Sequence, residues 1–252
     1  MVSFKQSVKE FFLPLVNKIL KFTPIRVKGK GDPNRNFSEF IAHVEGLGLH
    51  FKTVIDVGVA FGTNSLYTAL PHAHFHLVEP VPAMKVELER IARRVKATIH
   101  HVAAGSVDGV MAFNVHPDTS GSSALNQVEG TAFDGDAVTV PVRRLDSIIG
   151  SDVQKPVLLK IDTQGFELEV LAGASNILKD IDLIIIECSF HEFRHGAPEI
   201  LSIMKKMDEL GCAPYEILEG HYRPVDNALA QVDVAFVPKD SFLRSNKGAY
   251  RV

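Results

Sequence analysis

The chain has 252 residues, 46% of them hydrophobic, and a formal net charge of −3. This composition can bury the core of one large α/β domain, and the nearly balanced charge argues against nucleic acid as a partner. The two cysteines, Cys188 and Cys212, form neither a disulfide framework nor a metal-binding spacing. We therefore expect a reducing, cytoplasmic environment and no metal.

The first 30 residues combine apolar and basic side chains. Apolar residues recur at helical spacing from Phe4 to Phe22, with lysines interleaved and one break at Pro14. The run is charged throughout, so it is not a secretory signal, and no segment of the sequence is apolar over enough residues to span a bilayer. We predict an amphipathic helical appendage and linker over 1–30 and one domain over 31–252. The helix packs on the domain or forms a dimer contact, and peripheral membrane contact is the alternative.

The predicted elements of the domain begin with a helix from about Asn36 to Leu47. Strand Thr53–Val57 follows, and a glycine turn then leads into a helix at Thr63–Leu70. The next elements are strand His74–Glu79, a helix from Pro82 to about Val95, and strand Ala97–Val102. This alternation predicts a parallel sheet with crossover helices.

The pattern changes in the middle of the chain and then resumes. Val110–Val115 and Ala137–Val142 look like strands without a helix between them, so we predict an antiparallel excursion. The polar loop from Asp118 to Asp136 between them is of the kind that carries function. The later elements are strand Pro156–Asp162, helix Phe166–Leu178, strand Ile181–Glu187, helix Ala197–Leu210, and short strands Tyr215–Leu218 and Val232–Val237. The last two strands predict a hairpin at the sheet edge, with one strand antiparallel to the rest.

Four acids share one position in this pattern. Asp56, Glu79, Asp162 and Glu187 each end a mostly apolar strand. Parallel strands bring their carboxyl ends to one edge of the sheet, which is where α/β proteins bind ligands. One strand-end acid is weak evidence because an acid often caps the next helix, but four in register predict a ligand site.

The spacing of these acids indicates the kind of ligand. Glu79 follows Asp56 by 23 residues, close to the offset of roughly 20 residues of an acid that binds ribose hydroxyls. A dinucleotide site favours three glycines as GxGxxG, whereas this turn has only Gly58 and Gly62, and Asp56 precedes them. An acid there repels a pyrophosphate and suits a cationic ligand such as S-adenosylmethionine. A nicotinamide-dependent oxidoreductase is therefore the weaker alternative.

Several segments together resemble the FkbM family of S-adenosylmethionine-dependent methyltransferases. They are Val54–Gly58 with Gly62, Val78–Pro80, Leu145–Asp146, the loop Ser120–Leu125 and, most specifically, Leu159–Gly173. The resemblance implies a Rossmann-like class I methyltransferase fold. Such a fold has a mostly parallel seven-stranded sheet, an antiparallel C-terminal edge hairpin and helices on both faces. It also implies O-methylation of a sugar or other small hydroxylated molecule. A non-catalytic cofactor-binding or membrane-associated scaffold of the same fold is the alternative.

The resemblance and the strand-end positions together give candidate site residues. We expect Ser122, Ser123, Gln164 and Glu187 to contact the substrate that accepts the methyl group. The expected cofactor-binding residues are Asp56, Gly58, Phe61, Gly62, Asn64, Glu79, Pro80 and Ala104. The chain departs from the family pattern at Val59-Ala60, where Ala-Asn is usual, and at Gln164, where Glu is usual.

Methyl transfer to a hydroxyl requires a general base near the acceptor. Asp162, Glu187, His191 and His195 are the candidates that follow the central strands. We predict His191 as the base, because the unperturbed pKa of histidine suits this role. Asp162 is predicted to lie near the methyl group or the acceptor.

Overall fold

The computed structural model of the protein describes residues 35–116, 122–126, 128, 135–150 and 153–245. The predicted appendage at 1–30 lies outside these residues, so it and its boundary with the domain remain predictions. In the described part of the chain, no helix has the length and apolar character needed to cross a membrane. Elements up to residue 104 are α2 (Phe37–Gly46), β1 (Thr53–Val57), α3 (Asn64–Ala69), β2 (His74–Val78), η2 (Pro82–Met84), α4 (Lys85–Ala92), β3 (Lys96–His100) and β4 (Ala103–Ala104).

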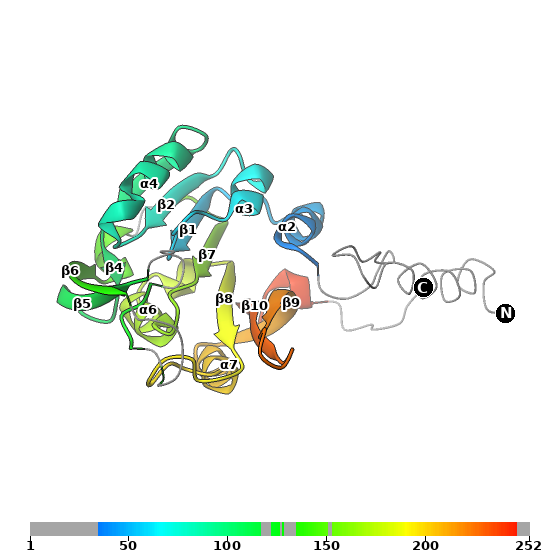
Figure 1. The fold of residues 1–252 in the computed structure, drawn as a ribbon. Helices are drawn as coiled ribbons and strands as arrows, with labels where there is room; N and C mark the ends of the chain where they lie inside the picture. Colours follow the sequence, from blue (N-terminus) through cyan, green and yellow to red (C-terminus); the bar gives the residue numbers. More distant parts are fainter. Residues whose placement is uncertain (1–34, 117–121, 127, 129–134, 151–152, 246–252) are drawn as a thin grey trace, which may run out of the picture. The chain divides into compact units, whose positions relative to one another are not determined.

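The remaining elements build the second half of the domain. They are β5 (Gly109–Val115), β6 (Asp136–Arg143), α5 (Leu145–Ile148), β7 (Val157–Ile161), α6 (Glu167–Gly173), η3 (Leu178–Asp180), β8 (Leu183–Ser189), α7 (Ile200–Glu209), β9 (Cys212–Tyr222), β10 (Leu229–Pro238) and η4 (Phe242–Arg244). Figure 1 shows the central strands between helices.

The main sheet has seven strands in the order β3-β2-β1-β7-β8-β10-β9. Strands β3, β2, β1, β7 and β8 are parallel neighbours, and β10 runs antiparallel to both β8 and β9. The predicted mostly parallel seven-stranded sheet with an antiparallel edge hairpin is therefore confirmed.

Helices cover both faces of this sheet, and each face has its own apolar core. One core joins α2, α3 and α4 to the sheet through residues such as Phe40, Leu66 and Phe75. The other joins α5, α6 and α7 to the opposite face through residues such as Leu159 and Met207. Strands β1 and β7 are buried along their whole length because both faces are covered, which explains their nearly continuous apolar sequences.

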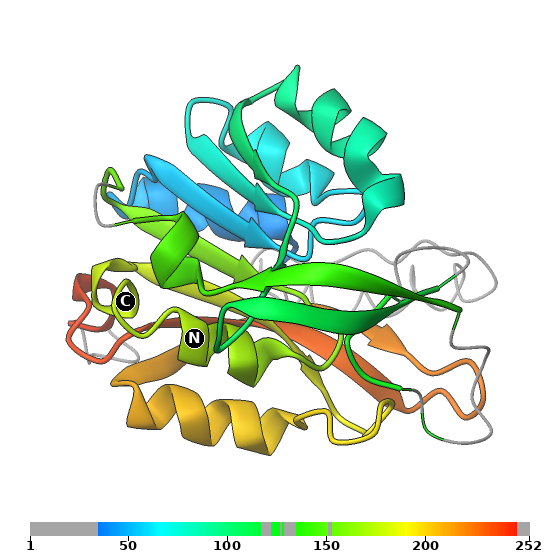
Figure 2. The same cartoon turned by 90° about the vertical axis from the view of Figure 1, so that its left-hand side faces the viewer.

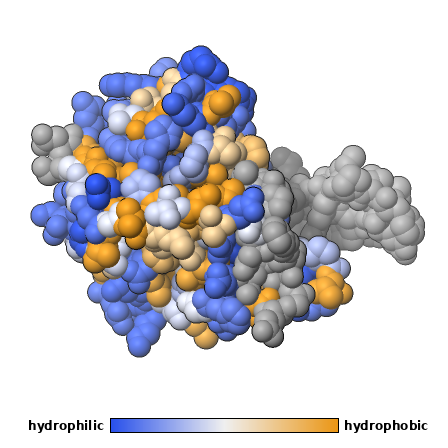
Figure 3. Space-filling model, turned by 60° about the vertical axis from the view of Figure 1, so that its left-hand side comes forward, coloured by the Kyte–Doolittle hydropathy of each residue, from blue (hydrophilic) through white to orange (hydrophobic). Residues whose placement is uncertain are grey.

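A separate three-stranded sheet, in the order β4-β6-β5, forms the predicted antiparallel excursion. Figure 2 shows its long strands as a ribbon in front of the main sheet. Its apolar side chains, including Phe113 and Val142, pack with Val81 and Met84 just beyond β2. Figure 3 shows apolar residues gathered across the middle of a face on this side of the molecule, with hydrophilic residues at the rim.

Some predicted helix bounds were wrong. The helix predicted over Phe166–Leu178 is the shorter α6, which ends at Gly173, followed by η3. A Cβ at Gly173 would lie 2.0 Å from the Gly105 backbone oxygen, so the last residue of this helix must be glycine where the two backbones pack closely. Helix α7 begins at Ile200 rather than Ala197, because Ala197 still belongs to a turn hydrogen-bonded to Arg194. The sequence pattern gave no sign of α5.

Three histidines at the β2–β3 edge predict a pH dependence of stability. His76 Nδ1 lies 3.1 Å from His100 Nε2, and the His74 and His76 ring centroids lie 4.8 Å apart. Burial, followed by the charges of His74 and His100, lowers the pKa of His76 to about 4. The unfolded chain therefore binds a proton near pH 6.5 that the folded chain resists, and stability falls as the pH drops from 6.5 to 4.

We expect this loss to be about 1–2 kcal/mol after allowance for solvent screening. Urea unfolding between pH 4 and 7 measures it, and His76→Gln should flatten the slope across this window. The exposed His72→Asn is the control and should keep the wild-type slope. A wild-type slope in His76→Gln would show that the histidine cluster does not cause the dependence.

Candidate active site

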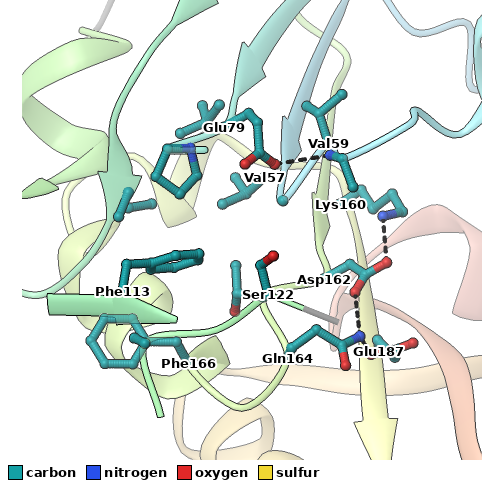
Figure 4. A pocket seen from close by; sticks show the side chains of 18 of the residues that line it. Val57, Val59, Glu79, Phe113, Ser122, Lys160, Asp162, Gln164, Phe166 and Glu187 are labelled. Atoms are coloured by element: carbon teal, nitrogen blue, oxygen red, sulfur yellow. Dashed lines mark hydrogen bonds and ion pairs between the residues drawn. The ribbon is translucent and has the colours of Figure 1, made fainter. Parts of the chain in front are cut away.

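A cavity of ≈ 440 Å³ opens at the carboxyl ends of β1, β2, β7 and β8. Figure 4 shows Phe113 and Phe166 on one side of it, Asp162, Gln164 and Glu187 across from them, and Glu79 on a third side. The residues that line the cavity are Val57 to Thr63, Val78 to Pro80, Ala103, Ala104, Met111, Phe113, Ser122, Ala124, Lys160, Asp162 to Gln164, Phe166, Glu187, His221 and Gln231.

The turn after β1 forms one wall of this cavity. Gly58 has φ +80°, and a Cβ there would lie 1.7 Å from the backbone oxygen of Asp162. Only glycine therefore fits where this turn crosses the end of β7. Ala60 also has a positive φ of 44°, a conformation that asparagine adopts more readily than alanine. The departure from the family pattern at Ala60 thus leaves the turn in place at some cost in strain.

Glu79 ties this turn to the end of β2. Its Oε2 accepts a hydrogen bond from the backbone N–H of Ala60, and its Oε1 accepts one from Val81, both at 2.9 Å. The carboxylate is 3% exposed, and its burial raises its pKa while the two backbone donors oppose that shift. A carboxylate has about four acceptor positions, so both oxygens keep room for donors from a ligand in the cavity.

Asp56 lies behind this wall rather than on it. Its Oδ2 accepts a hydrogen bond of 2.6 Å from the Tyr67 hydroxyl, and its Oδ1 lies 3.7 Å from Lys160 Nζ. Asp56 is fully buried and is not among the described residues that line the cavity. Lys160 stands opposite Asp56 in the β1–β7 register and also contacts Asp162 at 3.1 Å. We therefore assign Asp56 to holding Lys160, not to direct contact with a ligand.

The buried Lys160 predicts a large effect of its removal. Lys160→Met leaves Asp56 and Asp162 without this cation, which should lower the free energy of unfolding by about 3–5 kcal/mol. Lys155→Met is the matched control, because Lys155 makes its 2.8 Å ion pair with Asp180 on the surface, where such pairs contribute about 0–1 kcal/mol.

Urea unfolding of both variants measures the difference. Adding Asp56→Asn to Lys160→Met should recover part of the loss, because one buried charge is then removed with its partner. If Lys160→Met and Lys155→Met lowered the free energy of unfolding equally, burial of Lys160 between two acids would not be the cause of the loss.

Two amides hold the acids at the far side of the cavity. Gln164 Nε2 donates to Asp162 Oδ1 at 3.2 Å and to Glu187 Oε2 at 2.6 Å. Gln231 Nε2, from β10, donates to the same Glu187 oxygen at 2.8 Å. A glutamate at position 164 would add a third carboxylate between two others. An amide there satisfies both acids, which gives a physical reason for this departure from the family pattern.

The loop after β5 reaches the cavity through two serines with different contacts. Ser122 lines the cavity, and its hydroxyl accepts a hydrogen bond from the backbone N–H of His116. Ser123 is fully buried, and its hydroxyl donates to the backbone oxygen of Gln164 at 2.8 Å. Ser123 therefore holds Gln164, which has a positive φ of 55°, in place rather than facing a ligand.

The structure brings most of the predicted site residues together. The predicted residues on the cavity wall are Gly58, Phe61, Gly62, Glu79, Pro80, Ala104, Ser122, Asp162, Gln164 and Glu187. Asn64 is exposed, and its side-chain oxygen accepts from Arg94 instead. His191 packs edge-on against Phe193 and is not among the cavity-lining residues.

The sequence reasoning missed the contribution of the C-terminal hairpin. His221 on β9 and Gln231 on β10 both line the cavity, as does Lys160 on β7. Nothing in the local sequence of the hairpin marks these residues, because their position depends on β10 pairing with β8. Lys160 carried a signal, since a lysine in a strand buried along its whole length requires a buried partner.

The cavity has the chemistry of a site for a cationic nucleoside. Glu79 offers a buried carboxylate for a diol, and Phe113, Phe166 and Ala104 offer apolar surface for a flat ring. Glu79 and Asp162 line the cavity, and the charge of Lys160 is already shared between Asp56 and Asp162, so the described lining favours a positive charge. The residues present therefore fit the ribose, base and positive charge of S-adenosylmethionine.

A profile of the methyltransferase FkbM domain matches residues 56–211, more than half of the chain. The chain therefore belongs to the FkbM methyltransferase family, and its seven-stranded sheet has the Rossmann-like arrangement expected from that resemblance. It is 28% identical over 135 residues to the hexuronic acid methyltransferase AglP of Haloferax volcanii. That match covers 52% of this chain and 54% of AglP, so the chain spans about half the length of this curated relative.

Two solved methyltransferase structures have a distantly similar fold. The magnesium protoporphyrin IX methyltransferase ChlM of Synechocystis PCC 6803, with bound SAM, gives a TM-score of 0.42 at 14% identity over 94% of this chain and 98% of that one. The N-methyltransferase NodS of Bradyrhizobium japonicum WM9 gives a TM-score of 0.44 at 9% identity, with 80% of this chain and 94% of NodS covered.

Proposed function

We propose that the chain transfers a methyl group from S-adenosylmethionine to a hydroxyl of a small molecule, with a saccharide as the acceptor class. Membership of the FkbM methyltransferase family supports methyl transfer and supports S-adenosylmethionine as the cofactor. The single observation that supports this assignment best is the cavity itself, because the buried Glu79 and the Asp162–Glu187 pair line the same cavity from different sides. The relative that acts on hexuronic acid supports a sugar acceptor.

The proposed roles follow from position in the cavity. Gly58 and Gly62 let the turn approach the cofactor closely, Glu79 binds the ribose hydroxyls, and Phe61, Pro80 and Ala104 give apolar contact. When bound, the cofactor supplies an activated methyl group, so the protein mainly has to align the acceptor and take its proton. Ser122, Gln164 and Glu187 line the cavity, which supports a role for them in orienting the acceptor hydroxyl.

Asp162 and Glu187 replace His191 as the proposed base. Both acids line the cavity, and the neighbouring Lys160 holds the pKa of Asp162 low against the effect of burial. His191 instead lies near Asp226, outside the lining residues. A base must come within hydrogen-bond reach of the proton it removes, which favours the two acids.

Transfer of labelled methyl groups to a panel of neutral and acidic sugars tests this function. We expect Asp162→Asn to lower turnover at least about 100-fold, the usual contribution of a positioned base. Asp240→Asn, which changes an exposed acid, is the matched control and should keep full turnover. Cofactor binding without transfer to any hydroxylated acceptor would favour the alternative of a non-catalytic scaffold.

A further inference from the structure

Four buried or partly buried acids share one buried cation at the far side of the cavity. Asp56 and Asp162 both contact Lys160. Glu187 on β8 and Asp233 on β10 stand opposite each other in the antiparallel register. If all four acids were ionised, four negative charges would surround one cation in a cluster that is largely shielded from water, which is unfavourable. This crowding favours a proton on at least one of the four carboxyl groups.

The contacts indicate Glu187 as the group that holds it. Within the described residues, its side chain accepts hydrogen bonds from the neutral amides of Gln164 and Gln231, which both donate to Oε2. Its other neighbours are mainly acids: Asp162 from β7, Asp233 from β10 and Glu167 from α6, with Lys160 opposing them. Burial and these charges raise the pKa of Glu187 well above its ordinary value, and a hydrogen bond with Glu187 helps to lower that of Asp162.

We propose that Glu187 carries a proton in the free protein and releases it when a cationic methyl donor enters the cavity. This inference rests on the proposed function, because it takes S-adenosylmethionine as the ligand. Glu187 lines the cavity, so a positive charge bound there favours its ionised form. The Asp162–Glu187 pair then becomes a base only in the loaded site.

With Glu187 ionised in the loaded site, the charges and atoms of the methyl transfer balance. The acceptor hydroxyl gives its proton to Glu187, its oxygen forms the new bond to the methyl carbon, and the sulfur keeps the electron pair of the broken bond. The positive charge in the cavity disappears in this step. Glu187 is then protonated beside a neutral product, which is the state of the free protein.

Other titratable groups near Glu187 define the alternative sources of the proton. Burial raises the pKa of Asp233 to about 7, with Lys160 opposing this shift and Asp162 and Glu219 adding to it. His221, on β9, lines the same cavity. Asp233 is not among the described lining residues, so a bound cation should act on it less than on Glu187.

Calorimetry in phosphate and in Tris near pH 7 tests the proposal, since the difference in apparent enthalpy between the two buffers gives the number of protons released. S-adenosylmethionine should release up to about one proton more than S-adenosylhomocysteine, which lacks the sulfonium charge. The affinity for S-adenosylmethionine relative to that for S-adenosylhomocysteine should then rise by up to about tenfold per pH unit. Both ligands carry an amino group that titrates, so Glu187→Gln gives the baseline.

We expect the excess release to vanish in Glu187→Gln and to persist in Asp233→Asn. The same excess in wild type and Glu187→Gln, or its loss in Asp233→Asn alone, would overturn the proposal. Infrared absorption of a protonated carboxyl group in the wild type gives a second test that needs no variant. That band should weaken with S-adenosylmethionine and persist with S-adenosylhomocysteine. If the folded wild type binds neither ligand, the proposed function fails instead.

Discussion

Gly58→Ala should unfold most of the domain, with a loss of more than about 4 kcal/mol in the free energy of unfolding. Two effects add at this position. Gly58 has φ +80°, where a side chain is strained, and the new Cβ would lie 1.7 Å from the Asp162 backbone oxygen. That oxygen cannot move freely, because the Asp162 N–H donates to Val57 and keeps β7 paired with β1.

The matched control for this prediction is Gly211→Ala. Gly211 has nearly the same φ, +76°, but an added Cβ meets no atom within 4 Å. It therefore carries the backbone strain alone, about 1–2 kcal/mol. Urea unfolding followed by circular dichroism compares the two variants. If Gly58→Ala and Gly211→Ala lowered the free energy of unfolding equally, the close approach between the turn after β1 and the end of β7 would not require glycine.

Glu79→Gln should weaken the binding of S-adenosylhomocysteine about 100-fold or more. The substitution keeps the shape of the side chain but removes its charge, and hydrogen bonds to charged groups contribute about 1.5–3 kcal/mol. It also turns an amide donor toward the N–H of Ala60 or Val81, each of which now donates to a carboxylate oxygen. Calorimetric titration of wild type and variant measures the change.

Glu89→Gln on α4 is the control for Glu79→Gln. Glu89 is exposed, so its variant should bind like the wild type. Thermal unfolding of both variants separates weakened binding from loss of the fold. Unchanged affinity in a folded Glu79→Gln would remove Glu79 from the proposed ribose site.

The carboxyl ends of the parallel strands could be predicted from the sequence alone. Apolar strands ending in an acid, with a glycine turn and an expected crossover helix, were enough to place Glu79, Asp162 and Glu187 at one edge. The direction of each side chain was not accessible in the same way. Asp56 lies inside β1, level with Lys160 and two residues short of the level of Asp162, so it lies deeper in the sheet and contacts Tyr67 and Lys160.

Contacts between distant strands could not be predicted. Gln231 reaches Glu187 only because β10 pairs with β8, and the sequence contains no local signal for that register. His191 was predicted as the general base from the ordinary pKa of histidine and from its place just after β8. A residue past the end of a strand can turn away from the cavity, however. Residue chemistry indicated the kind of site, whereas long-range pairing decided which side chains form it.

Calorimetric titration of the wild-type protein with S-adenosylhomocysteine tests the central claim most directly, because it needs no acceptor. The cavity predicts binding at a single site with a dissociation constant of about 100 μM or tighter, and no comparable binding of NADH. A folded protein that shows no binding of S-adenosylhomocysteine at about 1 mM would contradict the account.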